Sequence, residues 1–307
     1  MKTIEERIRV LRAEKDAIIL AHNYTLPEVQ DLADFVGDSL ELALRAAAAG
    51  NPLIVFCGVH FMAETAKILN PRATVLMPDP RAGCPMADMA TAEQVRRARV
   101  AHPGCAVICY VNTSAAVKAE ADVCCTSANA PAVVAGIPEE RRIVFVPDRH
   151  LASWVSEVTG RELIPWSGFC PTHARILPEH LREARTLHPA ALAVAHPECS
   201  SAVRALADHV AGTSGILEFC REANHSAFII ATEQGLLHRL SAENPGKRFF
   251  AASTRMTCPN MKLSTAEALL WCLEDESGEV TVGADVASRA RGAIEHMLAV
   301  PRMARAS

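Results

Sequence analysis

Residues 53–85 read LIVFCGVHFMAETAKILNPRATVLMPDPRAGCP, and the order of residue types in this stretch predicts the class of fold. A run of branched and aromatic residues precedes an Ala-rich helical stretch, a Pro-containing turn, a second apolar run and a loop that ends in Cys-Pro. Two further stretches, 123–171 and 228–259, follow the same order and also end in Cys-Pro. Strands that alternate with helices indicate βαβ units and mostly parallel sheets, so we expect an α/β protein.

The three Cys-Pro pairs are almost evenly spaced. Cys84, Cys170 and Cys258 each precede a proline, no other cysteine does, and the two intervals are 86 and 88 residues. Chance similarity among α/β segments is the alternative, but equal spacing of the same dipeptide favours an internal repeat. We therefore expect three similar α/β domains followed by a C-terminal helical segment that packs back on the body. The expected ranges are 1–90, 91–174, 175–263 and 264–307.

The same alternation continues along the rest of the chain. Strands are expected at Ala17–Leu20, Leu53–Cys57, Thr74–Met77, Ala106–Tyr110, Ile143–Val146, Ala191–Val194, Phe228–Ala231 and Arg248–Ala251. Helices are expected at Leu26–Ala49, Phe61–Leu69, Ala130–Ala135 and Ser200–His209. Ligands of such sheets bind at the carboxyl ends of the strands, and most of the polar motifs described below follow a strand.

Composition excludes several classes of function. The 307 residues include 31 basic and 35 acidic ones, so the net charge of -4 offers no basic surplus for nucleic acid. No apolar stretch is long enough to suggest a membrane span, and the charged start lacks the apolar core of a signal peptide. Ile4, Ile8 and Leu11 recur at helical spacing, which predicts an amphipathic N-terminal helix. We expect a cytoplasmic protein with neither nucleic acid nor membrane as a partner.

Eleven cysteines in a reducing compartment suggest metal ligands or buried thiols rather than disulfides. The chain contains no C-x-x-C pair, which argues against zinc ribbons and bacterial ferredoxin sites. Three equivalent cysteines could instead bind three corners of a cubane iron–sulfur cluster and leave one iron open to substrate. Zinc with three cysteines and a water fits the residues equally well. The other eight are expected to be mainly packing residues: Cys57, Cys105, Cys109, Cys124, Cys125, Cys199, Cys220 and Cys272.

Polar motifs follow three of the expected strands. They are His22-Asn23-Tyr24, Tyr110-Val111-Asn112 and His196-Pro197-Glu198. A histidine and a carboxylate two residues apart can bind substrate and transfer protons, although each motif alone could serve only to order a loop. His173, three residues after Cys170, is expected near the metal.

Three hydroxyl residues stand where helices are expected to begin. They are Ser39, Ser127 and Thr213. Each could be an ordinary helix cap, but helix starts also bind anions, so together they suggest a substrate with two or more anionic groups.

In this order along the chain, the motifs resemble those of the quinolinate synthase family. The matching stretches are AHNY at 21–24, GDS at 37–39, AGCPMA at 82–87, YVN at 110–112, TSAN at 126–129, GFCPTH at 168–173, HPEC at 196–199, ATEQG at 231–235 and MTCPNMK at 256–262. The resemblance implies three domains in a pseudo-threefold arrangement around a 4Fe-4S cluster, and it favours iron over zinc. It implies Cys84, Cys170 and Cys258 as the three ligands, with one iron left open.

The resemblance also implies a reaction and a substrate site. The family condenses iminoaspartate (iminosuccinate) with dihydroxyacetone phosphate to give quinolinate, phosphate and two waters, and L-aspartate oxidase is an expected transient partner that supplies iminoaspartate. The implied substrate contacts are His22, Ser39, Tyr110, Val111, Asn112, Ser127, His196, Pro197, Glu198 and Thr213. Glu198 is the expected general base, with Tyr24 and His22 in other proton transfers. The alternatives are a cluster-dependent hydro-lyase acting on a dicarboxylate and a non-enzymatic iron–sulfur sensor.

Two positions depart from the family pattern. The family often has Gly-Ser-Thr before the third anion-binding helix, whereas Ala211-Gly212-Thr213 stands here. Some relatives carry a cysteine three residues beyond the last ligand, and this chain has Met261 there, so a C-x-x-C redox switch at that place is excluded.

Overall fold

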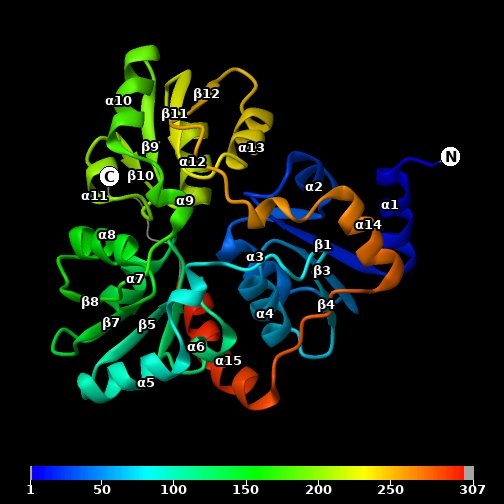
Figure 1. The fold of residues 1–307 in the computed structure, drawn as a ribbon, viewed down its shortest axis with the longest axis horizontal. Helices are drawn as coiled ribbons and strands as arrows, with labels where there is room; N and C mark the ends of the chain where they lie inside the picture. Colours follow the sequence, from blue (N-terminus) through cyan, green and yellow to red (C-terminus); the bar gives the residue numbers. More distant parts are fainter. Residues whose placement is uncertain (1, 301–307) are drawn as a thin grey trace.

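Three parallel four-stranded sheets form the framework of the computed structural model, which describes residues 2–300 (Figure 1). The sheets have the orders β2-β1-β3-β4, β6-β5-β7-β8 and β10-β9-β11-β12. The first contains β1 (Ala17–His22), β2 (Phe35–Gly37), β3 (Leu53–Cys57) and β4 (Thr74–Leu76). The second contains β5 (Ala106–Tyr110), β6 (Val123–Cys125), β7 (Ile143–Val146) and β8 (Leu163–Pro165). The third contains β9 (Leu192–Ala195), β10 (His209–Val210), β11 (Ala227–Ala231) and β12 (Arg248–Ala251).

Helices connect the strands and cover the sheets. The first part of the chain forms α1 (Ile4–Glu14), α2 (Pro27–Leu32), α3 (Ser39–Ala47), α4 (His60–Leu69), the 3-10 turn η1 (Ala87–Met89) and α5 (Ala92–Ala101). The middle forms α6 (Ala115–Lys118), α7 (Ala130–Ala135), α8 (Arg149–Thr159), α9 (Pro171–Ala174), α10 (Pro178–Leu187) and α11 (Ser201–Arg204). The last part forms α12 (Thr213–Glu222), α13 (Leu236–Glu243), the 3-10 turn η2 (Asn260–Lys262), α14 (Ala266–Asp275) and α15 (Ala284–Ala299). No helix among the described residues is long and apolar enough to cross a membrane.

The same strand order in all three sheets confirms the predicted fold class, three similar α/β domains built on parallel sheets. In each sheet the first strand of the domain is internal, and β1 pairs with both β2 and β3, in register from Ala17 beside Leu53. All six residues of β1 are buried, as expected for a strand covered on both faces. Figure 1 shows the three domains set around a common centre, in a pseudo-threefold arrangement.

Several expected elements have different bounds. The expected helical stretch Leu26–Ala49 is wrong as a single helix, because β2 separates α2 from α3. The expected helix start at Ser39 is confirmed, and Asp38 caps α3 by accepting from the N–H groups of Leu40 and Glu41. The expected helix Ser200–His209 is also wrong, because α11 ends at Arg204 and β10 begins at His209. Four strands lie outside the expected strand ranges: β2, β6, β8 and β10. Each has only two or three residues and lies at a sheet edge.

The predicted repeat is right in kind but wrong in register for its second copy. Residues 123–171 contain three strands, whereas 53–85 and 228–259 contain two each. The segment equivalent to those two is β7-α8-β8, which begins at Ile143. The stretch VCC at 123–125 is apolar enough to be taken for β7, but it is the edge strand β6.

Helices from both ends of the chain pack on the domains. The predicted N-terminal amphipathic helix is confirmed as α1, whose Ile8 is buried in a cluster with Leu269 and Leu273 of α14. Helix α15 packs against α4 of the first domain and α6 of the second. Residues 301–307 of the expected segment 264–307 lie outside the described residues. The domain boundaries given above remain predictions.

Candidate active site

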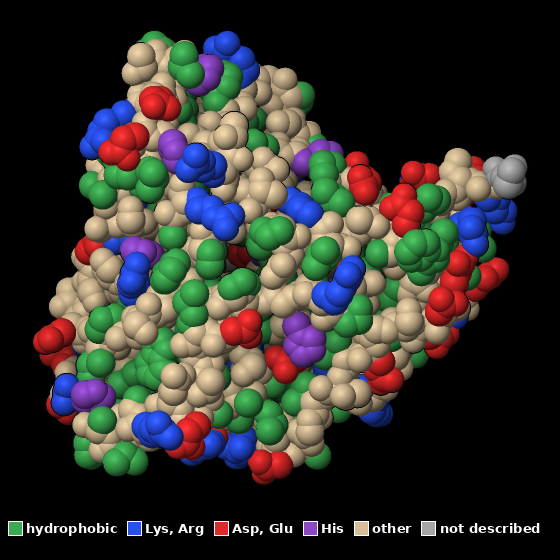
Figure 2. Space-filling view, viewed as in Figure 1, with side chains coloured by type: hydrophobic (Ala, Val, Ile, Leu, Met, Phe, Trp, Pro, Cys, Tyr) green, Lys and Arg blue, Asp and Glu red, His purple; other side chains and the backbone are tan. Residues whose placement is uncertain are grey.

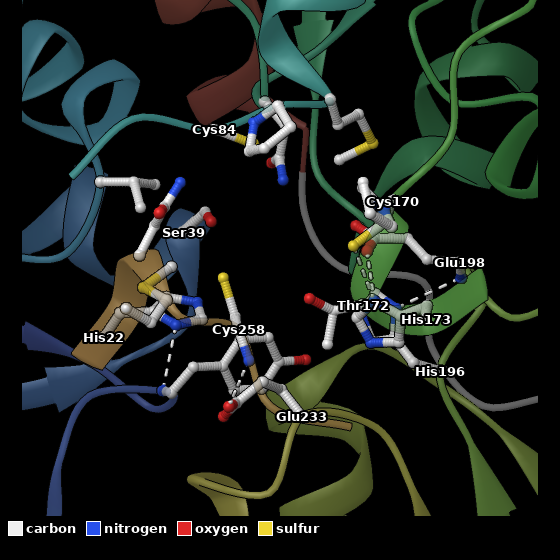
Figure 3. Close-up of a pocket in the computed structure, with 18 of the residues that line it drawn as sticks. His22, Ser39, Cys84, Cys170, Thr172, His173, His196, Glu198, Glu233 and Cys258 are labelled. Atoms are coloured by element: carbon white, nitrogen blue, oxygen red, sulfur yellow. Dashed lines mark hydrogen bonds and ion pairs between the residues drawn. The ribbon is translucent and has the colours of Figure 1, made fainter. Parts of the chain in front are cut away.

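One cavity lies where the carboxyl ends of the strands meet at the centre of the molecule (Figure 3). Its volume is about 160 Å³. Side chains from all three domains line it, because β1, β5 and β9 all end at this wall. Figure 2 shows acidic and basic side chains mixed over the face viewed in Figure 1, with several Lys and Arg around the middle.

Three cysteines face this cavity from equivalent places. Cys84 follows β4, Cys170 follows β8 and Cys258 follows β12, and Figure 3 shows them on different sides of one space. All eleven cysteines are free thiols, but only these three are partly exposed, and the other eight are buried. The cavity lining contains no further cysteine.

A short helical turn begins at or just after each Cys-Pro pair, and in α9 the proline is itself the first residue, a position that suits it. The turns are η1, α9 and η2. In all three, the backbone N–H of the third residue after the cysteine donates to the sulfur; these donors are Ala87, His173 and Met261. Burial raises the pKa of Cys84 to about 12, and it also raises the pKa of Cys170 and Cys258. A metal must therefore displace protons to bind these sulfurs.

Glu198 is one of three buried carboxylates in the cavity lining, the others being Asp38 and Glu233. Its Oε1 accepts from the Tyr110 hydroxyl at 2.5 Å, and its Oε2 lies 2.7 Å from Nδ1 of His173. Burial opposes ionisation, but attraction to His173 and the hydrogen bonds from His173 and Tyr110 hold the pKa of Glu198 below its ordinary value. Glu198 is therefore ionised at neutral pH and is held by two groups of the second domain, Tyr110 and His173.

The contacts continue from Glu198 to the second tyrosine. Nε2 of His173 lies 2.9 Å from the hydroxyl of Thr232, and that hydroxyl lies 2.6 Å from the Tyr24 hydroxyl. Burial, and next the charge of Glu198, raise the pKa of Tyr24 and of Tyr110 well above the ordinary value. Both tyrosines thus keep their protons at neutral pH and can act as donors.

His22 and His196 have matching environments in the first and third domains. Nδ1 of His22 accepts from the backbone N–H of Tyr24 at 3.2 Å, and Nδ1 of His196 accepts from that of Glu198 at 3.2 Å. Burial lowers the pKa of each histidine to about 3, so both are neutral at pH 7. A neutral ring that accepts at Nδ1 carries its proton on Nε2, so both histidines are N–H donors.

The three expected hydroxyl residues all line the cavity. Ser39 and Thr213 are the first residues of α3 and α12, and Ser127 precedes α7. The Ser127 hydroxyl lies 3.3 Å from Nε2 of His196. A Cβ added to Gly212 would come within 2.6 Å of that same hydroxyl, so the departure at residue 212 leaves room for Ser127.

Most, but not all, of the sequence-predicted site residues reach the cavity. The cavity lining includes every one of them except Val111 and Pro197. Val111 is buried and its N–H donates to the Cys125 carbonyl, while the Pro197 carbonyl accepts from Arg204. Direct substrate contact by these two residues remains a prediction.

The structure also brings in residues that the sequence did not single out. Glu233 follows β11 in the stretch Thr-Glu-Gln-Gly, and its Oε1 accepts from the backbone N–H of Cys258 at 3.0 Å. Lys262 forms an ion pair with this carboxylate and donates to the Tyr24 carbonyl. Arg175 is exposed and is the only Lys or Arg of the cavity lining. The sequence did contain a signal for Glu233, because this residue lies in a polar motif that directly follows a strand.

Fold and site together define a three-domain α/β protein with a central, cysteine-lined cavity, and comparisons with known proteins narrow this class. The family model described as Quinolinate synthetase A protein matches residues 6–299. A quinolinate synthase from Methanoregula boonei is 53% identical over 297 residues, which cover 97% of this chain and 98% of that protein. Quinolinate synthases from Thermodesulfovibrio yellowstonii and Geobacter metallireducens are 50% and 48% identical, with 97% and 98% of this chain covered and 98% of each relative. The chain therefore belongs to the quinolinate synthetase A protein family, a family of enzymes of NAD biosynthesis, and the resemblance seen in the motifs is confirmed.

Proposed function

We propose that this enzyme makes quinolinate from iminoaspartate and dihydroxyacetone phosphate, with release of phosphate and two waters. These substrates and products balance in atoms and electrons, so the reaction needs neither oxidant nor reductant. One arrangement carries the proposal: three partly exposed cysteines and the Glu198 network meet in one cavity, in a chain about half identical to proteins named quinolinate synthase. The cytoplasmic location and the partnership with L-aspartate oxidase remain predictions.

The cysteines fit an iron–sulfur cluster better than a single zinc ion. Thiolates around one tetrahedral zinc, with Zn–S near 2.3 Å, lie about 3.8 Å apart. Among the described residues, the only metal-type ligand atoms that all lie within 4.8 Å of one another belong to Cys170, His173 and Glu198. The three cysteine sulfurs are spread more widely, which suits ligands of separate iron atoms.

Cys84, Cys170 and Cys258 would hold a 4Fe-4S cluster, and their loops are prepared for it. The N–H donors of Ala87, His173 and Met261 already point at the sulfurs and would stabilise thiolates. Because this lining has three cysteines for four irons, the bound cluster would supply one open iron able to act as a Lewis acid.

The proton transfers fall to the polar network. Closing the pyridine ring requires removal of protons from carbon, and the ionised Glu198 is the base placed to accept them. Tyr24 and Tyr110 keep their hydroxyl protons and can donate toward departing oxygen. His22 and His196 present Nε2–H groups that can orient a carbonyl or carboxylate oxygen.

The anionic groups of the substrates need donors, and the cavity supplies mainly neutral ones. Ser39, Ser127, Thr213 and Asn112 offer hydroxyl and amide groups, and Arg175 adds one positive charge from its exposed position. Holding both substrates among these donors also lowers the entropic barrier to their condensation.

An anaerobic assay tests the proposal. Reconstituted enzyme with iminoaspartate should form quinolinate only when dihydroxyacetone phosphate is added, in proportion to its iron and sulfide content. Turnover of a dicarboxylate in the absence of dihydroxyacetone phosphate would identify a hydro-lyase instead. No turnover by iron-loaded protein would favour the sensor, and stoichiometric zinc in a colourless, anaerobically purified protein would refute the cluster.

A further inference from the structure

Three buried polar side chains occupy equivalent positions behind the three substrate loops. Gln30, Lys118 and Arg204 each lie eight residues beyond the first site residue of their loop, which is His22, Tyr110 or His196. Each sits on the short helix that follows, which is α2, α6 or α11. Their exposed fractions are 5%, 0% and 5%, although charged side chains are rarely buried without partners.

Gln30 joins the first domain to the third. Its Nε2 lies within 3.0–3.1 Å of the carbonyl oxygens of Asn23 and Thr25, in the loop that holds His22 and Tyr24. The same nitrogen lies 3.1 Å from the Gly235 carbonyl, at the start of α13 in the third domain.

Lys118 joins the second domain to the first in the same way. Its Nζ donates to the Thr113 carbonyl, just beyond the Tyr110–Asn112 loop. This ammonium also lies 5.3 Å from the ring centroid of Phe61 on α4, a cation–π contact with the first domain.

Arg204 joins the third domain to the second and makes the largest number of these contacts. Its Nη1 donates to the carbonyls of Cys199 at 2.7 Å and Pro197 at 3.3 Å, on both sides of Glu198 in the chain. The same guanidinium reaches the second domain, where Nη1 donates to the His150 carbonyl at 3.2 Å. Its Nη2 donates to Ser153 at 3.1 Å and Glu157 at 2.6 Å, both on α8.

We propose that Gln30, Lys118 and Arg204 are three equivalent positioning residues, each of which ties the substrate loop of its own domain to the neighbouring domain. The contacts run in a cycle, from first to third, third to second and second to first. Glu198 must meet Tyr110 of the second domain within hydrogen-bond distance, and Arg204 fixes the loop of Glu198 against that domain. Small displacements of a reacting group cost on the order of a hundredfold in rate, so this cycle sets the geometry of the site. The measurements of kcat described below rest on the proposed function, whereas the measurement of hydrogen exchange does not.

The test compares Arg204→Met with a matched control, Arg161→Met, in reconstituted enzyme. Arg161 also donates to three backbone carbonyls, but all three belong to the second domain, and Arg161 is not part of the cavity lining. We expect Arg204→Met to lower kcat for quinolinate on the order of a hundredfold with KM and iron content little changed. Arg204→Lys should recover only part of the rate, because a single ammonium group cannot donate to all the acceptors in both domains that the guanidinium group reaches. Arg161→Met should retain wild-type kcat.

A double variant separates positioning from general damage. If Arg204 acts through Glu198, Arg204→Met should slow the Glu198→Gln enzyme far less than it slows the wild type. The proposal would be overturned if Arg204→Met lowered kcat by the same factor in the wild type and in Glu198→Gln. It would also be overturned if Arg204→Met had the kcat of the wild type. If Arg204→Met does not fold, the double variant Ser153→Ala/Glu157→Ala can replace it, because it removes only the side-chain acceptors on α8. An unchanged kcat in that double variant would also contradict the proposal.

Hydrogen exchange supplies a readout that does not depend on the reaction. Backbone amides of residues 196–204 should exchange faster in Arg204→Met than in wild type or Arg161→Met, whether or not quinolinate forms. Unchanged exchange with unchanged activity would reject the positioning role. Absence of quinolinate from the wild type, with faster exchange in the variant, would reject the proposed function and leave the positioning role supported.

Discussion

The hydroxyl of Tyr110 donates a 2.5 Å hydrogen bond to Oε1 of Glu198 across the junction of the second and third domains. Because the other oxygen of Glu198 meets His173, the carboxylate is held at both ends before any substrate arrives. A base held in this way needs little reorganisation during reaction. Its position also depends on how the domains are set against each other.

Glu198→Gln should retain the cluster and substrate binding but lower kcat for quinolinate at least roughly a hundredfold, the low end for loss of an acid–base group. The amide has nearly the same shape, so iron content and KM should change little. Single-turnover assays on anaerobically reconstituted enzyme measure the effect. The exposed Glu183 on α10 provides the control, and Glu183→Gln should be indistinguishable from wild type. Near-normal quinolinate formation by Glu198→Gln would remove Glu198 from the mechanism.

Cys84→Ser should lower the iron and sulfide content of the protein and abolish quinolinate formation, because the cavity lining has no fourth cysteine to replace the lost ligand. Iron and sulfide analysis with visible absorbance measures this outcome. Cys272→Ser, which changes a buried thiol on α14 remote from the cavity lining, should keep the full iron content. A Cys84→Ser enzyme that works at the normal rate would contradict the assignment of Cys84 as a ligand.

The stability of the metal-free protein should decrease as pH falls below about 6.5, the ordinary pKa of histidine. Burial lowers the pKa of His22 and His196 to about 3 in the folded state, so between these values the unfolded chain binds more protons. Each histidine then costs up to about 1.4 kcal/mol of unfolding free energy per pH unit, and nothing above that window.

Denaturant unfolding at pH 7.5 and 5.5 measures this slope. His22→Gln should lose less stability than wild type over that range, because glutamine does not titrate. Replacing the exposed His225 in the same way is the control and should leave the slope unchanged. Equal slopes in all three proteins would show that His22 is accessible to protons in the folded state.

The sequence predicted the fold well where the signal was local. Apolar runs such as Ile143–Val146 are buried strands, and the equal spacing of Cys84, Cys170 and Cys258 reflects three loops in equivalent places. Short edge strands such as β10 were missed, because two residues carry no period of their own. Their pairing with a neighbouring strand defines them, and that pairing is a property of the folded chain.

Site residues were predictable where a polar motif followed a strand, but their partners were not. Nothing local to Tyr110 indicates that it meets Glu198, since 88 residues separate them and domain packing joins them. Arg204 lies on a helix and has no motif of its own, so its role becomes visible only when the three loops are superposed in the repeat. Val111 illustrates the opposite case, because a motif drew attention to a side chain that the cavity lining does not include.

Gly212 gives the last prediction, because it is the point where this chain departs from the family pattern. A Cβ there would come within 2.6 Å of the Ser127 hydroxyl and 3.3 Å of its Cβ. A serine hydroxyl can rotate away at small cost, so Gly212→Ala should fold and keep its iron. Rotation would, however, break the 3.3 Å contact between Ser127 and His196 and remove a donor from the cavity.

We therefore expect Gly212→Ala to raise KM for one anionic substrate roughly fivefold, which corresponds to the loss of one hydrogen bond of about 1 kcal/mol, with kcat less affected. Ser127→Ala should raise the same KM, and the double variant should be no worse than either single one, because both changes remove the same donor. Gly292→Ala is the matched control, since a Cβ at Gly292 meets no atom within 4 Å. Additive effects of Gly212→Ala and Ser127→Ala would show that Gly212 acts through something other than the Ser127 hydroxyl.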